Sequence, residues 1–255
     1  MSIIYGGAVF YLISGGFFFL RTFLGIGWSF AGYISMGIAL SLYLYNFISV
    51  YIQMGRFPVG DPYGMASLMG NLLVLIYLIV SILMRKNLAD FGFLVAFLGF
   101  LTTLAGIPAK KLGYPNPFYV YHILSAGVAY ASLILAGISS AVKFIVERKL
   151  KAKHIEGFMM PVNLLRKLER LLINLGFIFL TLTLIFGSIW AKAHLGTHWI
   201  NDPKLFLTLM LWIYYAGIIH LNLLRGLKPA QLSAMSLLGF ILSVGSLLFI
   251  RHSVS

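Results

Sequence analysis

The chain has 255 residues, of which 60% are hydrophobic and 10% charged, and its mean hydropathy is +0.96. Soluble domains carry about a quarter charged residues, so this composition excludes that class and indicates a protein that lies largely in a bilayer. The net charge of +13 favours basic loops that orient a membrane protein over nucleic-acid binding. Because the chain has no cysteine, disulfides, thiolate metal sites and thioredoxin-like chemistry are excluded.

The apolar residues fall into eight unbroken stretches, each close to the ~20 residues that a membrane-spanning helix needs. In chain order they are Ile3–Leu20, Ile26–Ile52, Tyr63–Leu83, Phe91–Ile107, Phe118–Val142, Leu171–Ala191, Leu205–Leu224 and Ala230–Ile250. Strands of an outer-membrane barrel would instead alternate in segments of about ten residues. The sequence therefore predicts an all-α, polytopic integral membrane protein with about eight transmembrane helices, in which residues 1-255 form a single domain.

The positive charges are unevenly divided between the two sides of this plan. Thirteen of the nineteen Lys and Arg residues lie on one side, and eight of them lie between Lys143 and Arg170. Cytoplasmic loops carry such an excess, so we expect this basic segment to lie in the cytoplasm and to meet anionic lipid headgroups. A docking surface for a partner protein is the alternative. Both termini are then expected on the outer side of a cell membrane.

Four of the six histidines collect at the predicted outer face. His122 opens the fifth stretch, His194 and His198 lie between the sixth and seventh, and His252 follows the eighth. Taken singly, each fits an interfacial polar residue. Two neutral imidazoles are a common ligand pair for haem iron, and His122 and His252 would form one if the fifth and eighth helices are neighbours.

The remaining histidine patterns allow two readings each. His220 lies within the predicted seventh helix, where an ionisable residue is a functional candidate; the alternative is a hydrogen bond to a neighbouring helix. His194 and His198 are four residues apart and would share one face of a helix if the loop were helical. That spacing suits a metal ion, but Asp202 is the one further ligand nearby, which leaves a zinc or copper site incomplete.

The segment from Gly187 to Gly226 holds three of the four tryptophans, Trp190, Trp199 and Trp212. An aromatic belt at the bilayer surface would account for them. Asp202 followed by Pro203 fits the start of a helix, with Asp as the N-cap and Pro in the first turn.

These residues also resemble the tryptophan-rich signature of the cytochrome c assembly family of the CcsA/ResC type, a pattern close to GxxWAxxxxGxxWxWDPK followed by LxxWxxYxxxxH. The matching positions are Gly187, Trp190, Ala191, Gly196, Trp199, Asp202, Pro203, Lys204, Trp212, Tyr215 and His220. The segment that holds His122, with Tyr130 eight residues later, resembles a helix of the family that carries an outer histidine. The C-terminal segment FIRHSVS resembles the family's last segment, and its His252 corresponds to the final outer histidine. The resemblance covers most of the chain.

The resemblance implies a transmembrane cytochrome c assembly-type domain over residues 1-255, with haem b as its cofactor or cargo. His122 and His252 would be the axial ligands of an external haem, and His220 would hold haem during its passage from the cytoplasm. The loop Leu195–Asp202 would lie against the haem. The site residues that this implies around the loop are Trp190, Gly196, His198, Trp199 and Asp202.

The same resemblance implies partners. The family hands haem to an apocytochrome c, whose cysteines form thioether bonds, and it usually works with a CcsB/ResB-type membrane partner. This chain, which has no thiol, would be part of a synthase complex and not an enzyme on its own.

Some positions depart from the family pattern and keep other functions open. Leu195 and Asn201 stand where tryptophans are usual, and Arg56 stands in place of a histidine. Fewer tryptophans make a smaller surface for stacking on a porphyrin. HemX-like relatives share the eight-helix plan with a degenerate loop and regulate haem biosynthesis through the level of glutamyl-tRNA reductase. A small-molecule transporter is a third alternative, although it would need broken or polar helices near the midplane.

Overall fold

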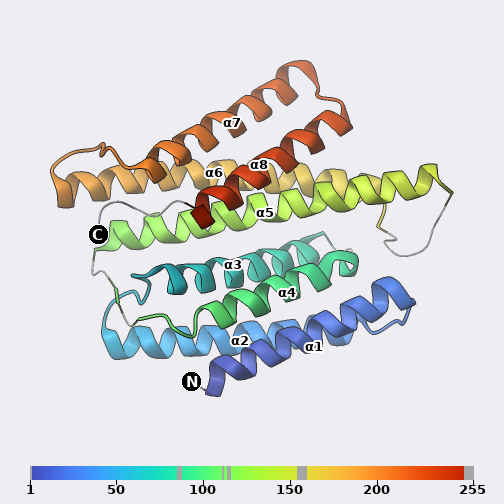
Figure 1. Cartoon of the computed structure of the whole chain (residues 1–255), viewed down its shortest axis with the longest axis horizontal. Coiled ribbons are helices and arrows are strands. Elements are labelled where there is room, and N and C mark those ends of the chain that lie inside the picture. Colours follow the sequence, from blue (N-terminus) through green and yellow to red (C-terminus); the bar gives the residue numbers. More distant parts are fainter. Residues whose placement is uncertain (1, 85–87, 111, 114–115, 154–159, 250–255) are drawn as a thin grey trace. The chain divides into compact units, whose positions relative to one another are not determined.

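The computed structural model describes residues 2–84, 88–110, 112–113, 116–153 and 160–249. The elements within these ranges are eight α-helices (Figure 1). They are α1 (Ser2–Leu24), α2 (Ser29–Met54), α3 (Pro62–Leu83), α4 (Ala89–Ala105), α5 (Pro117–Lys151), α6 (Val162–Leu195), α7 (Pro203–Arg225) and α8 (Pro229–Phe249). Seven of these helices are long and apolar enough to cross a membrane, and α4 is a shorter apolar helix of 17 residues. The prediction of an all-α polytopic membrane protein is confirmed.

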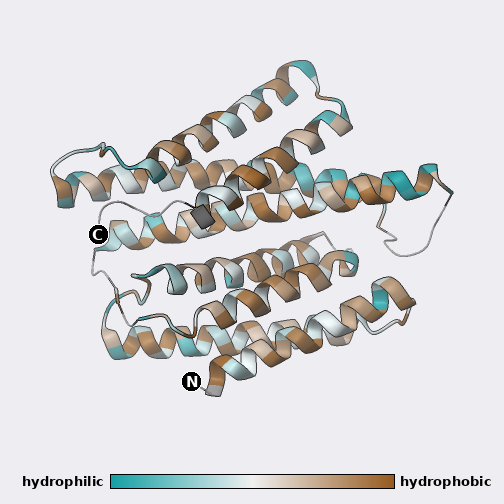
Figure 2. Ribbon diagram, viewed as in Figure 1, coloured by the Kyte–Doolittle hydropathy of each residue, from teal (hydrophilic) through white to brown (hydrophobic). Residues whose placement is uncertain are grey.

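The helices carry apolar side chains on their outer surfaces. Phe30 is 75% exposed and Leu83 is 73% exposed, a surface that water would not tolerate but a bilayer accepts. Figure 2 shows apolar residues along every helix and hydrophilic residues toward the C-terminal end of α5 and in the first turns of α6.

Helices α5 and α6 are longer than the apolar stretches predicted for them. They contain 35 and 34 residues, or about 50 Å at 1.5 Å per residue, against about 30 Å of hydrocarbon. The extra turns are the charged segments around Arg148 and Arg166. Lys, Arg and Glu are good helix formers, so the helix continues where the apolar pattern ends.

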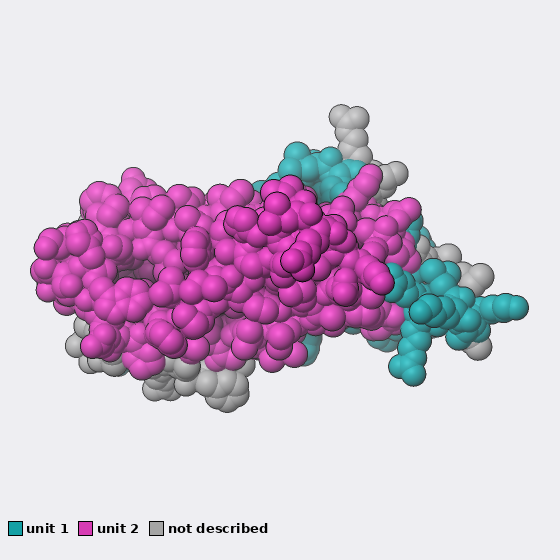
Figure 3. All heavy atoms as spheres, turned by 90° about the horizontal axis from the view of Figure 1, so that it is seen from above, with its two compact units in different colours: residues 1–115, 146–161 teal, residues 116–145, 162–255 magenta. Residues whose placement is uncertain are grey.

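The chain divides into two compact units (Figure 3). Unit 1 comprises Met1–Pro115 and Val146–Pro161, and unit 2 comprises Asn116–Ile145 and Val162–Ser255. Unit 1 therefore holds α1 to α4, and unit 2 holds α6 to α8 with most of α5.

Unit 1 is held together by close helix contacts and a buried polar network. The Tyr11 hydroxyl donates to Asn71 Oδ1 at 2.7 Å, and Asn71 Nδ2 donates to Thr103 Oγ1 at 3.2 Å, which joins α1, α3 and α4. A Cβ at Gly70 would lie 1.8 Å from Thr102 Oγ1, so α3 and α4 touch where only glycine fits.

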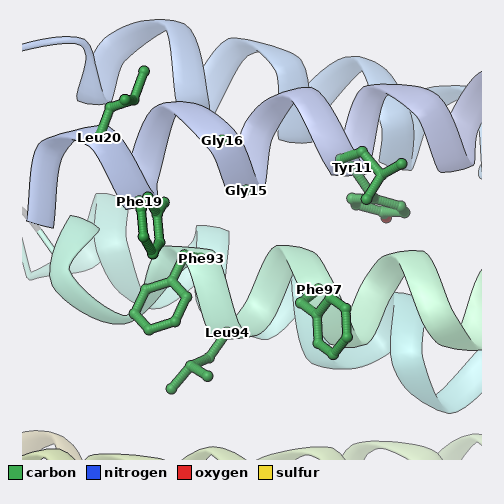
Figure 4. A pocket seen from close by; sticks show the side chains of 9 residues that line it. Tyr11, Gly15, Gly16, Phe19, Leu20, Phe93, Leu94 and Phe97 are labelled. Carbon is green, nitrogen blue, oxygen red and sulfur yellow. The ribbon is translucent and has the colours of Figure 1, made fainter. Parts of the chain in front are cut away.

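An apolar groove of about 530 Å³ runs between α1 and α4 within unit 1 (Figure 4). Phe19, Phe93 and Phe97 line it, and Gly15 and Gly16 lie along the α1 side. Such a lining suits hydrocarbon, not water. The groove contains none of the residues that the sequence predicts to be functional.

Unit 2 is an antiparallel arrangement in which α5 contacts both α6 and α8. A Cβ at Gly176 of α6 would lie 2.4 Å from Leu133 Cδ2 of α5, and a Cβ at Gly137 of α5 would lie 2.4 Å from Phe240 Cβ of α8. Small residues allow this close approach, which is how helices gain packing energy in a bilayer.

Candidate haem-handling site in unit 2

His122 lies near the start of α5 and is bound by α6. Its Nδ1 atom is 2.9 Å from the main-chain carbonyl oxygen of Thr183. Because a carbonyl only accepts, Nδ1 carries a proton, and in the neutral imidazole Nε2 is then the nitrogen with the lone pair that a metal ligand needs. The Thr183 hydroxyl donates to Ser125 Oγ at 3.2 Å and ties the same two turns together.

Gly187 makes room for this imidazole. A Cβ at Gly187 would lie 2.8 Å from His122 Nδ1, closer than real side chains approach. Successive spacings of four, three and four residues place side chains on one face of α6. This face carries Thr183, Gly187, Trp190 and His194. The sequence alone assigns no role to Thr183, and its helical spacing from Gly187 and Trp190 is the one signal that could have indicated it.

Trp190 lies one turn further along the same face, between two aromatic rings. Its ring centroid is 5.3 Å from that of His194, with the planes 22° apart, and 5.8 Å from that of Tyr119. The indole Nε1 is buried and has no hydrogen-bond partner among the described residues. A buried donor without an acceptor is costly, so a ligand that brings an acceptor oxygen would be stabilised there.

The loop after α6 folds back onto the end of that helix. Ser188 Oγ and His198 Nδ1 are 3.1 Å apart, and Lys192 Nζ donates to the Gly196 carbonyl at 3.0 Å. Gly196 has a φ of 74°, a left-handed conformation that favours glycine. These contacts bring His198 and Gly196 to the part of α6 that also carries Trp190.

Trp199 and Asp202 occupy different environments in this loop. The Trp199 side chain is 46% exposed, so its ring face is accessible. Asp202 is buried, and its carboxylate accepts hydrogen bonds from the main-chain nitrogens of Lys204 at 2.8 Å and Leu205 at 3.2 Å. With Pro203 as the first helical residue, the predicted N-cap of α7 is confirmed.

The metal-binding alternative for His194 and His198 finds no support in the structure. Helix α6 ends at Leu195, so the two histidines do not share a helix face. Within the described ranges there is no group of three His, Cys, Asp or Glu side chains that could hold a metal ion.

His220 lies apart from the loop. It is on an exposed face of α7, and its Nδ1 donates to the Ala216 carbonyl of the same helix at 2.7 Å. This bond lies within α7 and is not the bond to a neighbouring helix that the alternative describes. His220 is 18 residues beyond Asp202, about 25 Å along the helix.

Trp212 also lies outside the loop. Its Nε1 donates to Thr181 Oγ1 at 2.8 Å, and its ring stacks on Phe177 with centroids 5.7 Å apart. Trp212 therefore joins α7 to α6, whereas Trp190 and Trp199 lie at the end of α6 and in the loop that follows it.

His252 lies outside the described residues, but the helix before it is placed against α5. The Tyr130 hydroxyl and Ser246 Oγ are 3.1 Å apart, and Lys143 Nζ donates to the Pro229 carbonyl at 3.0 Å. Helices α5 and α8 are therefore antiparallel neighbours, which is the condition stated above for a pair formed by His122 and His252.

Comparison with known proteins identifies the family of this chain. Residues 59–254 match the family described as Cytochrome C assembly protein. The chain is 24% identical over 222 residues to cytochrome c biogenesis protein CcsA of Chlamydomonas reinhardtii, covering 82% of this chain and 62% of that protein. It is 30% identical over 156 residues to CcsA of Prochlorococcus marinus strain MIT 9515, covering 52% of this chain and 49% of that protein.

A third relative, CcsA of Guillardia theta, is 26% identical over 226 residues, covering 75% of this chain and 72% of that protein. The chain thus spans between 49% and 72% of the length of these relatives. Because the family match extends over most of its length, the chain belongs to the cytochrome c assembly protein family.

Proposed function

We propose that this protein handles haem in c-type cytochrome biogenesis and presents haem b at the outer face of the cell membrane for attachment to apocytochrome c. The observation that carries the proposal is the setting of His122, whose Nδ1 is held by the Thr183 carbonyl. With Nδ1 bonded to this carbonyl, Nε2 is the ring nitrogen that would bind iron. Family membership supports the same conclusion.

The second axial ligand would be His252. Tyr130, eight residues after His122, contacts Ser246, six residues before His252. Because α5 and α8 run antiparallel, the start of α5, where His122 lies, and the end of α8, which precedes His252 in the sequence, are at the same end of unit 2. This register supports the pairing.

The loop would hold the porphyrin by stacking and polar contacts. Trp199 offers an accessible ring face, and Trp190 offers an indole N–H that has no partner within the described part of the chain. Porphyrin propionates suit basic partners such as Lys192. Gly196 and His198 shape the loop against α6, and Asp202 anchors its other end as the cap of α7.

The attachment reaction needs groups that this chain lacks. A cysteine thiol adds across a haem vinyl group, so that sulfur bonds to one vinyl carbon and the proton goes to the other. With no cysteine in the chain, the thiols belong to apocytochrome c. This protein would position the haem, and synthase activity would belong to a complex with a CcsB/ResB-type membrane partner.

The route of haem and the orientation of the chain complete the proposal. The basic ends of α5 and α6 would face the cytoplasm by the positive-inside rule, and the loop after α6 and both termini would lie outside. His220, on the bilayer-facing surface of α7, would hold haem on its way to the outer site.

The test is the absorption spectrum of the purified protein, with His122→Ala and His252→Ala beside the wild type. We expect a reduced bis-histidine haem spectrum that both substitutions abolish or alter. His154→Ala, in the basic segment, is the control and should leave the spectrum unchanged. A wild-type protein that stays colourless with a CcsB-type partner and excess haem contradicts the proposal. If the protein stays colourless and its deletion changes the level of glutamyl-tRNA reductase in the cell, the HemX-like function is favoured.

A further inference from the structure

A charged pair is completely buried where three helices of unit 2 meet. Lys143 Nζ of α5 lies 2.9 Å from Glu169 Oε2 of α6, and both side chains are 0% exposed. Ser140 Oγ donates to the other carboxylate oxygen at 2.7 Å. The carboxylate is therefore bonded on both of its oxygens.

The same ammonium group also binds α8. Lys143 Nζ donates to the carbonyl of Pro229, the first residue of α8, at 3.0 Å. Helix α7 holds α8 separately, through the Tyr214 hydroxyl and the Met235 carbonyl at 2.7 Å. The pair thus connects the start of α8 to α5 and α6.

A gain in the stability of the fold does not explain why this ion pair is buried. Taking two charges out of water costs about as much as their attraction returns, and apolar replacements of similar volume are often neutral or stabilising. Within a bilayer there is little hydrophobic drive between helices, because lipid tails are as apolar as the side chains. Directional polar contacts therefore help to distinguish one helix register from the next, beside the close packing at glycines.

We infer that the Lys143–Glu169 pair sets the register of α8 against α5, and so positions the outer end of α8, after which His252 follows, relative to His122. Lys143 is 21 residues from His122 on α5, and Pro229 is 20 residues before Phe249, where α8 ends. Each interval is about 30 Å of helix. Glu169 holds the ammonium in place, and Pro229 receives its hydrogen bond. The purpose of this arrangement rests on the proposed function, but the register does not.

The register can be measured without haem because the chain has no cysteine. A Cβ at Gly137 would lie 2.4 Å from Phe240 Cβ. The Cβ atoms of a disulfide lie about 3.5 to 4.5 Å apart. The Gly137→Cys and Phe240→Cys substitutions therefore place two thiols within disulfide reach once α5 and α8 move apart by about 1 to 2 Å. The yield of this cross-link, in otherwise wild-type protein in membranes, reports the seating of α8 on α5.

The test combines the cross-link with the double substitution Lys143→Met and Glu169→Leu. Removing both charges avoids the uncompensated buried charge that Glu169→Gln would leave and that would hinder folding. We expect wild-type amounts of folded protein, a several-fold lower cross-link yield and loss of the bis-histidine spectrum. Added imidazole should restore a six-coordinate low-spin spectrum, as it should for His252→Ala, because it replaces a displaced ligand.

Ser139→Ala is the matched control. Ser139 is equally buried, and its hydroxyl donates to the Leu165 carbonyl of α6 at 3.1 Å without reaching α8. We expect it to leave the cross-link and the spectrum unchanged. An unchanged cross-link yield in the double variant would overturn the inference. A wild-type protein that never binds haem, with a cross-link that still falls in the double variant, would overturn the proposed function and leave the register inference standing.

Discussion

The imidazole of His122 and the main-chain carbonyl of Thr183 are joined by a hydrogen bond of 2.9 Å between α5 and α6. A main-chain acceptor cannot be removed by substitution, so the tautomer of His122 depends on the distance between the two helices. That distance depends in turn on Gly187, whose missing side chain leaves space beside the same Nδ1 atom.

Gly187→Ala is therefore expected to weaken haem binding without unfolding the protein. The new Cβ would lie 2.8 Å from His122 Nδ1 and would displace the ring from the Thr183 carbonyl. Loss of such an orienting bond typically lowers metal affinity about 10- to 100-fold. Haem titration followed by absorbance measures the effect. Gly37→Ala, where a Cβ meets no atom within 4 Å, should titrate like the wild type.

The tryptophans are expected to separate into two functions. Trp199→Ala removes an accessible stacking surface and should lower haem affinity by about 1 kcal/mol, the usual worth of an aromatic pair, with little change in thermal stability. Trp212→Phe breaks the bond to Thr181 Oγ1 and should lower the free energy of unfolding by about 1 kcal/mol. Thermal unfolding in detergent and haem titration of both variants give the comparison; equal effects on affinity would contradict it.

Asp202 is expected to act as a helix cap and not as a charge. Asp202→Ala removes the acceptor for the nitrogens of Lys204 and Leu205 and should cost about 1 kcal/mol of stability. Asp202→Asn keeps an acceptor oxygen and should recover most of that loss. Thermal unfolding in detergent measures both. Failure of Asn to recover stability would show that the carboxylate charge itself is needed.

His220→Gln is expected to change haem delivery and not folding. The side chain is exposed on α7, and substitutions at such positions usually change stability by less than about 0.5 kcal/mol. We expect less haem in protein purified from cells, but normal loading of the outer site when haem is added to the purified protein. Reduced loading in both experiments would place His220 in the outer site itself.

Gly70→Ala tests the packing of unit 1. The Cβ would lie 1.8 Å from Thr102 Oγ1, and overpacking of this kind costs about 1 to 3 kcal/mol. Gly16→Ala is the matched control, since its Cβ meets no atom within 4 Å. A lower unfolding temperature for Gly70→Ala alone is the expected result.

The helical fold follows from the sequence because apolar runs of membrane length leave few alternatives. Each of the eight stretches overlaps one helix over most of its length, and the N-cap at Asp202 was predictable from the Asp202-Pro203 pair alone. The extensions of α5 and α6 were not predicted, since their charged turns lack the apolar signal that marks a membrane segment.

The candidate site was only partly predictable for a different reason. His122 and Trp190 stand out as rare polar and aromatic residues in an apolar chain. Thr183 does not, because it acts through a main-chain atom that every residue possesses. The ion pair of Lys143 and Glu169 was equally hidden, since both lie in a segment whose other charges are mostly exposed, and only the helix packing shows that these two are buried.

Helix α5 continues without interruption from Pro117 to Lys151 and so fixes the angular phase between His122 and Lys143. These residues are 21 positions apart, or almost six full turns. One residue inserted between them would rotate His122 by about 100° relative to Lys143, away from Thr183 if the ion pair stayed in place. The number of residues between the two side chains is therefore a constraint in its own right, whatever residues fill the interval.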